Sequence, residues 1–163
     1  MDYLWTPWRF AYVTTADRAA SCVFCEKPSG GNDEVEYIVY RGRENYIVLN
    51  IFPYTVGHLL IVPYRHIAAL AEGTAAELTE MMELTRRSEE VLRKVYRPHG
   101  INVGMNIGKS AGAGVAGHLH MHILPRWEAD SNFLSVIGET RVLPEELPLT
   151  WNKLRAEFQA LAA

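Results

Sequence analysis

The chain has 163 residues, of which 48% are hydrophobic and 21% are charged, and its formal net charge is −3. These values are typical of one globular domain with a full hydrophobic core, and they exclude a global positive field that would attract nucleic acid. No apolar run approaches the roughly 20 residues that span a bilayer, and the start lacks the features of a secretory signal, so we expect a cytoplasmic protein without membrane or nucleic-acid partners.

The N-terminal part of the chain offers two features. Residues 1–20 are rich in aromatic side chains but show no clear period, and we expect an arm that lies over the core or over a partner subunit. Cys22 and Cys25 follow as the only cysteines, too few for a disulfide framework. Their spacing fits metal binding, redox chemistry or simply two buried thiols.

The next elements alternate between short apolar runs and turns, and one long helix interrupts them. The helix is predicted at 74–97, with Thr74 as N-cap, Glu77 completing a capping box, and Pro98 just after the end. A short helix is expected near 151–161. Strands are predicted at 35–40, 46–50, 58–62, 101–107 and 118–124. This order predicts an α+β domain with a mainly antiparallel five-stranded sheet, one long helix and a short C-terminal helix.

The last of these strands carries the most informative pattern, His118-Leu119-His120-Met121-His122-Ile123-Leu124. Alternate side chains of a strand point to one face, so the three imidazoles would share a face while the apolar residues between them pack on the other. The alternative is a half-buried strand that happens to present histidine, but solvated strand faces usually carry Thr, Lys, Glu or Arg. Since histidine suits nucleophilic, acid–base and metal chemistry near neutral pH, we favour a chemical site.

The pattern His-φ-His-φ-His-φ-φ, with φ apolar, resembles the signature of the histidine triad (HIT) family. The resemblance extends over residues 22–127: the segment 50–66 is similar to the family's nucleoside-binding strand pair, and Cys22 to Cys25 to its metal half-site. The segments 4–9 and 126–133 further resemble the branch that contains diadenosine tetraphosphate phosphorylases. We therefore expect a single HIT domain over 1–163, in which residues 22–127 form the core and 128–163 a C-terminal extension.

The resemblance implies nucleotidyl transfer through a covalent enzyme–nucleotide intermediate. His120 would attack the α-phosphorus, His122 would donate to a non-bridging phosphate oxygen, and His58 would orient the imidazoles. The expected substrates are dinucleoside polyphosphates such as diadenosine tetraphosphate, with water or inorganic phosphate as acceptor. Alternatives are a nucleoside phosphoramidate hydrolase and a nucleotide-binding protein without turnover. A zinc-dependent hydrolase is disfavoured because no carboxylate stands at a spacing suited to a general base.

Several residues are expected to bind the substrate. Asn50 matches the position at which the family binds ribose hydroxyls, although asparagine at a strand end is also a common turn residue. The base slot would draw on Ile38, Ile51 and Phe52. The full expected set of substrate-binding residues is Asn50, Asn106, Ser110, Gly112, Gly114, Val115 and Gly117.

The loop before the triad is rich in glycine, and glycine lets backbone N–H groups approach a phosphate closely. A flexible hairpin connection is the alternative interpretation. Many family members carry Gln or Ser just before the first histidine to assist the leaving group, and this chain has neither at 111–117. Asn106, Lys109 and Ser110 are the nearest polar candidates, so the substrate class within the family stays open.

The resemblance also implies a metal site, because structural zinc needs four ligands. His66 and His118 match the positions used in the metal-binding branch, and together with Cys22 and Cys25 they would leave no open coordination position. The zinc would then be structural, and no organic cofactor is expected. His99, at the end of the long helix, is interpreted as a surface partner of the helix dipole.

Finally, the family pairs two subunits edge to edge, and we expect a homodimer or a higher homo-oligomer. A small antiparallel sheet leaves an edge strand that must be covered. Met81, Met82 and Leu84 lie on more than one face of the predicted long helix, which we interpret as an interface, and the aromatic arm favours one too. The alternative is a monomer whose arm folds over its own core.

Overall fold

The computed structural model describes residues 21–128, 130 and 143–162. The arm expected at 1–20, which includes the segment 4–9, lies outside the described residues. So do residues 129 and 131–133 of the segment that resembles the phosphorylase branch.

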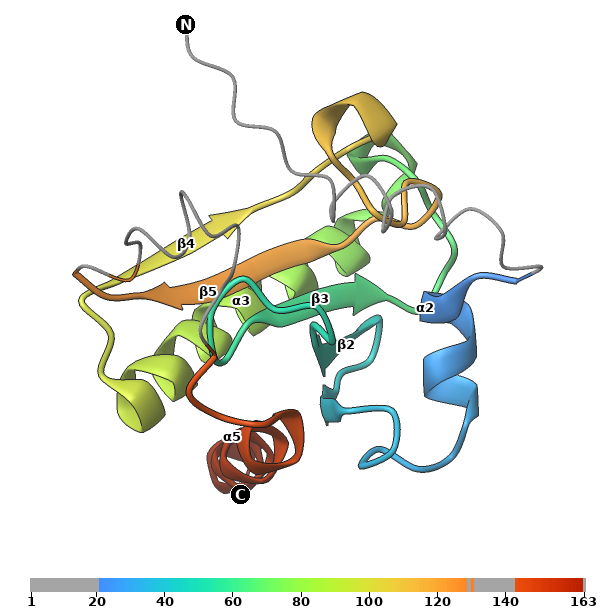
Figure 1. The fold of residues 1–163 in the computed structure, drawn as a ribbon. Helices are drawn as coiled ribbons and strands as arrows, with labels where there is room; N and C mark the ends of the chain where they lie inside the picture. The colour runs from blue at the N-terminus through green and yellow to red at the C-terminus, as the bar shows by residue number, and fades with distance from the viewer. Residues whose placement is uncertain (1–20, 129, 131–142, 163) are drawn as a thin grey trace, which may run out of the picture.

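Five strands form one antiparallel sheet in the order β1-β2-β3-β5-β4 (Figure 1). β2 and β3 are buried at every position, because both faces of the central strands are covered. This explains why their sequences are continuous apolar runs with little alternation. The predicted five-stranded fold is confirmed, with these bounds: β1 Ile38–Arg41, β2 Asn45–Leu49, β3 Leu59–Pro63, β4 Gly100–Gly104 and β5 Met121–Arg126.

The long helix α3 spans Ala75–Tyr96 and begins at the predicted capping box. The Thr74 side chain accepts a hydrogen bond from the Glu77 N–H, and the Glu77 carboxylate accepts one from the Thr74 N–H at 2.7 Å. The helix ends at Arg97, whose φ of 47° is left-handed and turns the chain out of the helix. The C-terminal helix α5 spans Leu147–Ala162, one turn longer than expected.

Four shorter pieces complete the described elements: the single helical turn α2 at Val23–Glu26, and the 3₁₀ turns η1 at Lys27–Ser29, η2 at Leu70–Glu72 and η3 at Lys109–Ala111. α2, which contains Cys25 and begins directly after Cys22, was not predicted, because a four-residue helix has no detectable period. No described helix has both the length and the apolar character needed to cross a membrane.

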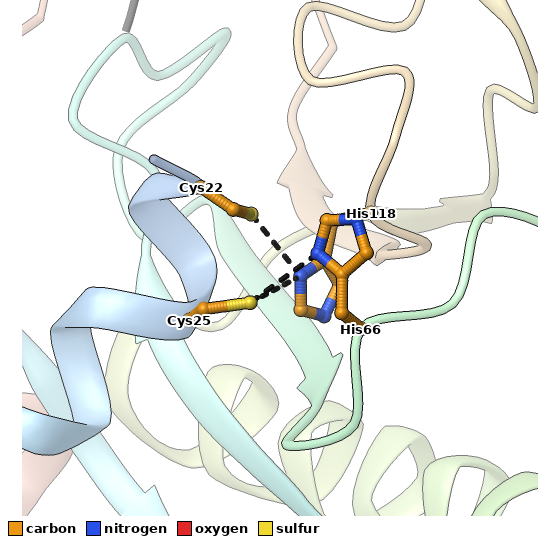
Figure 2. Close-up of side chains that lie close together, drawn as sticks. All are labelled: Cys22, Cys25, His66 and His118. Carbon is orange, nitrogen blue, oxygen red and sulfur yellow. Dashed lines mark hydrogen bonds between the residues drawn. The ribbon is translucent and has the colours of Figure 1, made fainter. Parts of the chain in front are cut away.

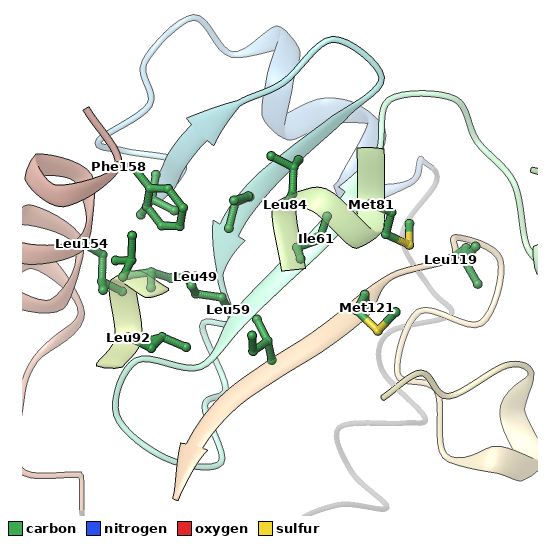
Figure 3. Close-up of a cluster of buried hydrophobic side chains, with 14 of the residues drawn as sticks. Leu49, Leu59, Ile61, Met81, Leu84, Leu92, Leu119, Met121, Leu154 and Phe158 are labelled. Carbon is green, nitrogen blue, oxygen red and sulfur yellow. The ribbon is translucent and has the colours of Figure 1, made fainter. Parts of the chain in front are cut away.

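The sheet has two differently covered faces. Helices α3 and α5 pack on one face, where they meet side chains from the central strands in the main core (Figures 1 and 3). On the other face, Phe24 of α2 joins a second buried cluster. The alternation of β2 and β3 divides their side chains accordingly: Ile47, Leu49, Leu59 and Ile61 lie in the main core, whereas Tyr46, Val48, Leu60 and Val62 lie in the cluster of α2.

The interpretation of the long helix as an interface was wrong for two of its three residues. Met81 and Leu84 are 1% and 2% exposed and belong to the core under the sheet, as Figure 3 shows. Only Met82, at 57% exposed, faces outward. The buried stripe of α3 is wide because it packs against both the sheet and α5, so apolar residues on more than one side of the helix are still core.

Candidate active site and metal centre

The histidine segment lies partly before its strand. β5 begins only at Met121, because the backbone before it bonds elsewhere: the His118 N–H donates to the Val115 carbonyl and the Leu119 N–H to that of Ile67, at 2.6 Å. The expected alternation is nevertheless present. The apolar residues of the segment lie in the main core, while Phe24 of the opposite cluster contacts the rings of His118 and His120.

His120 is held in one tautomer by the backbone. Its side chain is only 5% exposed, and its Nδ1 lies 2.7 Å from the His118 carbonyl oxygen. A carbonyl can only accept, so Nδ1 carries the proton and Nε2 keeps its lone pair. Burial also lowers the pKa of His120, which favours the neutral ring. The side chain is thus in the form that a nucleophile requires.

A second chain of hydrogen bonds fixes His58 and His122. The Tyr54 N–H donates to His58 Nδ1 at 3.1 Å, so this nitrogen is an acceptor. His58 Nε2 then carries the proton and donates to His122 Nδ1 at 2.9 Å. His122 must therefore bear its own proton on Nε2, and this buried atom has no hydrogen-bond partner among the described residues.

His122 lies beside His120, and its ring is also held in the neutral form. Burial first, and the neighbouring His120 second, lower the pKa of His122 to about 4, so the ring is neutral at pH 7. The ring centroids of His120 and His122 are 4.9 Å apart. One ring thus offers a lone pair and its neighbour an N–H, an arrangement suited to attack on a centre whose oxygens gain negative charge.

Asn50 has one contact typical of a turn residue and one contact with the histidines. Its Oδ1 accepts from the Phe52 N–H at 2.9 Å, as in a turn, and its Nδ2 lies 3.3 Å from His58 Nδ1, to which it can donate. Of the candidates for a base slot, Ile51 and Phe52 are exposed. Ile38 was a wrong candidate, because it is fully buried under the sheet and lines no open surface.

The glycine-rich loop is anchored to the body of the protein. Gly112 has a φ of 91°, which favours glycine, and its N–H donates to the Lys109 carbonyl. Ala113 is buried, and Val115 packs against the cluster that contains Phe24. Gly117 lies beside the metal-site imidazole of His66. Gly114 is half-buried within the same loop, and no described hydrogen bond joins Asn106 or Ser110 to the histidines.

The four expected metal ligands converge (Figure 2). Cys22 at the start of α2 and Cys25 within it project toward the two imidazoles, and the four ligand atoms all lie within 4.8 Å of one another. Cys22 Sγ is 3.3 Å from His118 Nδ1, and Cys25 Sγ is 3.3 Å from His66 Nδ1 and 3.5 Å from His118 Nδ1. Around a tetrahedral zinc, sulfur and nitrogen ligands stand about 3.6 Å apart, so the donor set fits this ion.

A hydrogen bond behind the cluster aims His118 at it. His118 Nε2 lies 2.9 Å from the Pro63 carbonyl oxygen and donates to it, so Nδ1 presents its lone pair to the sulfur atoms. Such a contact from the far ring nitrogen is the usual support of a metal-bound histidine. His118 therefore directs its lone pair toward the two cysteines, whereas His120 and His122 do not belong to this cluster.

Three groups that contact the histidines were not predicted from the sequence: the Phe24 ring, the Tyr54 N–H and the Pro63 carbonyl. The contacts of backbone groups cannot be recognised from residue types. The one available signal was that Tyr54 lies inside the segment 50–66, which resembles the family's nucleoside-binding strand pair. His99 lies on the surface, as expected. Its Nδ1 also accepts from the Glu128 N–H at 3.0 Å, so it joins the chain after β5 to the end of the helix.

Comparison with known proteins agrees with this geometry. The HIT domain family matches residues 33–129, more than half of the chain. The chain therefore belongs to the histidine triad family, and the resemblance seen in the sequence is confirmed.

Two curated relatives and one solved structure are informative. The chain is 42% identical over 166 residues to the AP-4-A phosphorylase of Mycobacterium tuberculosis, which covers 97% of this chain and 85% of that protein. It is 34% identical over 93 residues to the asymmetrical bis(5'-nucleosyl)-tetraphosphatase of Schizosaccharomyces pombe, covering 57% of this chain and 50% of that one. A Zn-bound histidine triad family protein from Mycobacterium smegmatis matches with a TM-score of 0.71 and 28% identity, over 87% of this chain and 96% of that one.

Proposed function

We propose that this protein is a nucleotidyl hydrolase or phosphorylase that cleaves dinucleoside polyphosphates at the α-phosphate through a covalent nucleotidyl–His120 intermediate. The observation that carries the proposal is the pairing of a lone pair on His120 Nε2 with an N–H on His122 Nε2 in a buried site. The substrate class is supported by the names of the two curated relatives, a phosphorylase of AP-4-A and a bis(5'-nucleosyl)-tetraphosphatase.

The reaction takes two displacements at phosphorus. His120 Nε2 forms a bond to the α-phosphorus, and the bond from that phosphorus to the bridging oxygen breaks, so the leaving polyphosphate departs with the electron pair. The acceptor then attacks the same phosphorus and breaks the P–N bond, which restores the free imidazole. Water as acceptor yields AMP and phosphate yields ADP, while diadenosine tetraphosphate releases ATP in the first step.

The neighbouring groups have supporting roles in this proposal. The His122 N–H donates to a non-bridging oxygen as its charge grows, which is the kind of contact that contributes most to such reactions. His58 holds His122 in the tautomer that makes this donation. Asn50, already bonded to His58, binds the ribose hydroxyls with the remaining capacity of its amide.

The loop before the triad binds the phosphates through backbone N–H groups of Gly114, Val115 and Gly117, while Gly112, whose own N–H donates to the Lys109 carbonyl, shapes the loop for this approach. Its anchoring through Val115 against the Phe24 cluster, on the same face as His120, supports this assignment. Asn106 and Ser110 are the proposed polar contacts of the leaving group. Asn106 follows β4 two residues after Gly104, which pairs with His122 across the sheet.

We assign a structural zinc to Cys22, Cys25, His66 and His118. The compact donor set supports zinc, and the Zn-bound neighbour shows that a protein of this fold has been crystallised with this metal. With four protein ligands no coordination position is left for substrate, so the ion would supply folding free energy and no catalytic group.

The decisive experiment incubates the protein with diadenosine tetraphosphate, with and without phosphate, and resolves AMP, ADP and ATP. His120→Asn should retain the fold but lose about 5 kcal/mol or more of barrier lowering, a loss of several thousandfold in rate. His99→Asn is the matched control, because it makes the same exchange at an exposed histidine away from the triad.

Labelling identifies the intermediate. With α-³²P-labelled substrate, an acid-labile adduct should appear on the wild type and on His99→Asn but not on His120→Asn. Near-normal turnover by His120→Asn would exclude it as nucleophile. Cleavage of a nucleoside phosphoramidate without cleavage of the dinucleotide would overturn the substrate class.

A further inference from the structure

Phe24 stands between the metal centre and the proposed nucleophile. It lies between the two cysteines on α2, and its side chain is only 6% exposed. Its ring centroid is 5.0 Å from that of His120 with an interplanar angle of 52°, and 5.6 Å from that of His118. These separations are those of aromatic rings in direct contact. The residue thus touches one metal ligand and the nucleophile at the same time.

The helical turn that carries Phe24 cannot fix its own position. α2 has four residues, and the Cys22 side chain makes no capping hydrogen bond. A single turn is unstable by itself, because the entropy of ordering it exceeds what its few hydrogen bonds return. Three external contacts hold it: the two cysteines in the metal cluster, the buried Phe24 ring, and the Tyr46 hydroxyl, which donates to the Phe24 carbonyl at 2.7 Å.

Two of the three described contacts of the His120 ring lead back to this metal cluster. The His120 Nδ1–H is bonded to the carbonyl of His118, which is itself a ligand. The ring is also packed by Phe24, which is flanked in sequence by the two cysteine ligands. The third contact is with the ring of His122. A hydrogen bond to a single carbonyl leaves the ring free to rock about it, so the two packing contacts set the direction of Nε2, and Phe24 provides the one that depends on the cluster.

We propose that Phe24 is a positioning residue that couples the metal site to the nucleophile. When the cluster holds its ion, α2 keeps the Phe24 ring against His120 and so keeps Nε2 aimed at the phosphorus. When the ring is removed, or the turn is loosened, His120 samples other orientations. The inference rests on the proposed role of His120, and it assigns Phe24 no contact with the reacting atoms.

The test replaces the ring with an aliphatic side chain in Phe24→Leu. Val48→Ala is the matched control, since Val48 is buried in the same cluster but lies on β2, which β3 separates from the histidine strand. Tyr46→Phe is the second probe, because it removes the hydroxyl that anchors the Phe24 carbonyl while leaving every metal ligand in place. Zinc content and melting temperature are measured first on each purified protein.

Two further readouts separate positioning from stability. In ¹⁵N-histidine NMR spectra, the His120 ring should lose its single Nδ1–H pattern in Phe24→Leu and shift part of the way in Tyr46→Phe. The single-turnover rate of adduct formation at saturating substrate should fall about 10- to 100-fold in Phe24→Leu, because small misplacements of a reacting atom cost this much. Val48→Ala should leave both readouts unchanged even where it lowers the melting temperature.

The proposal is overturned if Phe24→Leu behaves as Val48→Ala does in the spectra and the single-turnover rate. It is also overturned if Phe24→Leu raises only KM, which would mark a substrate contact. If Phe24→Leu fails to fold, the His120 signals of Tyr46→Phe in the same NMR spectra test the proposal, and signals identical to those of the wild type overturn it. A wild type that forms no adduct would refute the proposed function, while the NMR comparison would still decide the coupling between Phe24 and His120.

Discussion

We expect the free energy of unfolding to fall at acidic pH because of His122, over a pH interval that is set by the pKa of this histidine. Burial and the adjacent His120 lower the pKa of His122 from 6.5 to about 4. As the pH falls below 6.5, the unfolded chain protonates this imidazole while the folded chain does not. The unfolded state therefore binds more protons, and the free energy of unfolding falls between pH 6.5 and 4. Above pH 6.5 the ring is neutral in both the folded and the unfolded state, so the free energy of unfolding does not change on account of His122.

The magnitude follows from the size of the pKa change. Each tenfold change in proton affinity corresponds to about 1.4 kcal/mol, so the fall to about 4 sets a ceiling of about 3 kcal/mol. Since the ring is only partly shielded from water, we expect about 2 kcal/mol. Glu77 does not interfere, because its hydrogen bonds to Arg65 lower its pKa to about 2, and its contribution is lost only as the pH falls below 4.5.

The assay compares the wild type with His122→Asn in urea denaturation at pH 7.0, 6.0, 5.0 and 4.5. The titratable groups that do not contact His122 are common to both proteins, so their titration cancels in the difference between the two free energies of unfolding. Between pH 7.0 and pH 4.5, the free energy of unfolding of the wild type should fall by about 2 kcal/mol more than that of His122→Asn. A difference constant to within about 0.5 kcal/mol would refute the depressed pKa.

Three further outcomes are expected. Phe158→Ala in α5 should cost about 3–5 kcal/mol of unfolding free energy, because Phe158 is 1% exposed in the main core, whereas Leu149→Ala at a 51% exposed position of the same helix should cost less than about 0.5 kcal/mol. Cys22→Ala should lose bound zinc and melt at a lower temperature without removing the nucleophile, and metal analysis of fresh, unchelated wild type that finds no zinc would contradict this. Light scattering at micromolar concentration should give twice or four times 18.4 kDa, and a particle of 18.4 kDa would establish a monomer.

Local signals in the sequence predicted much of the fold. The capping box at Thr74 and the stop at Pro98 placed both ends of α3, because these contacts lie within three or four residues along the chain. The alternation of the histidine segment likewise identified which side chains face the main core. The set of four metal ligands came from the family resemblance, and their convergence is a property of the fold that no local pattern encodes.

Features that depend on distant partners were missed. The start of β5 is displaced because the Leu119 N–H bonds to Ile67, some fifty residues away in sequence. α2 exists because of the contacts of Phe24 and its flanking cysteines with residues far along the chain. The burial of Met81 and Leu84 depends on where α5 packs, and periodicity along α3 alone carries no such information.

The direction of the hydrogen bonds through His58 and His122 begins at a main-chain group, the N–H of Tyr54. Every amino acid except proline supplies this N–H at position 54, so ordinary substitutions leave the polarity of the pair intact. A peptide N–H also does not titrate near neutral pH, so acid cannot reverse the pair from that end. His122 Nε2 is the proton-bearing atom at the far end of this pair, and it has no partner among the described residues. The path of the backbone at Tyr54 therefore helps to determine which nitrogen of His122 offers its N–H to the site.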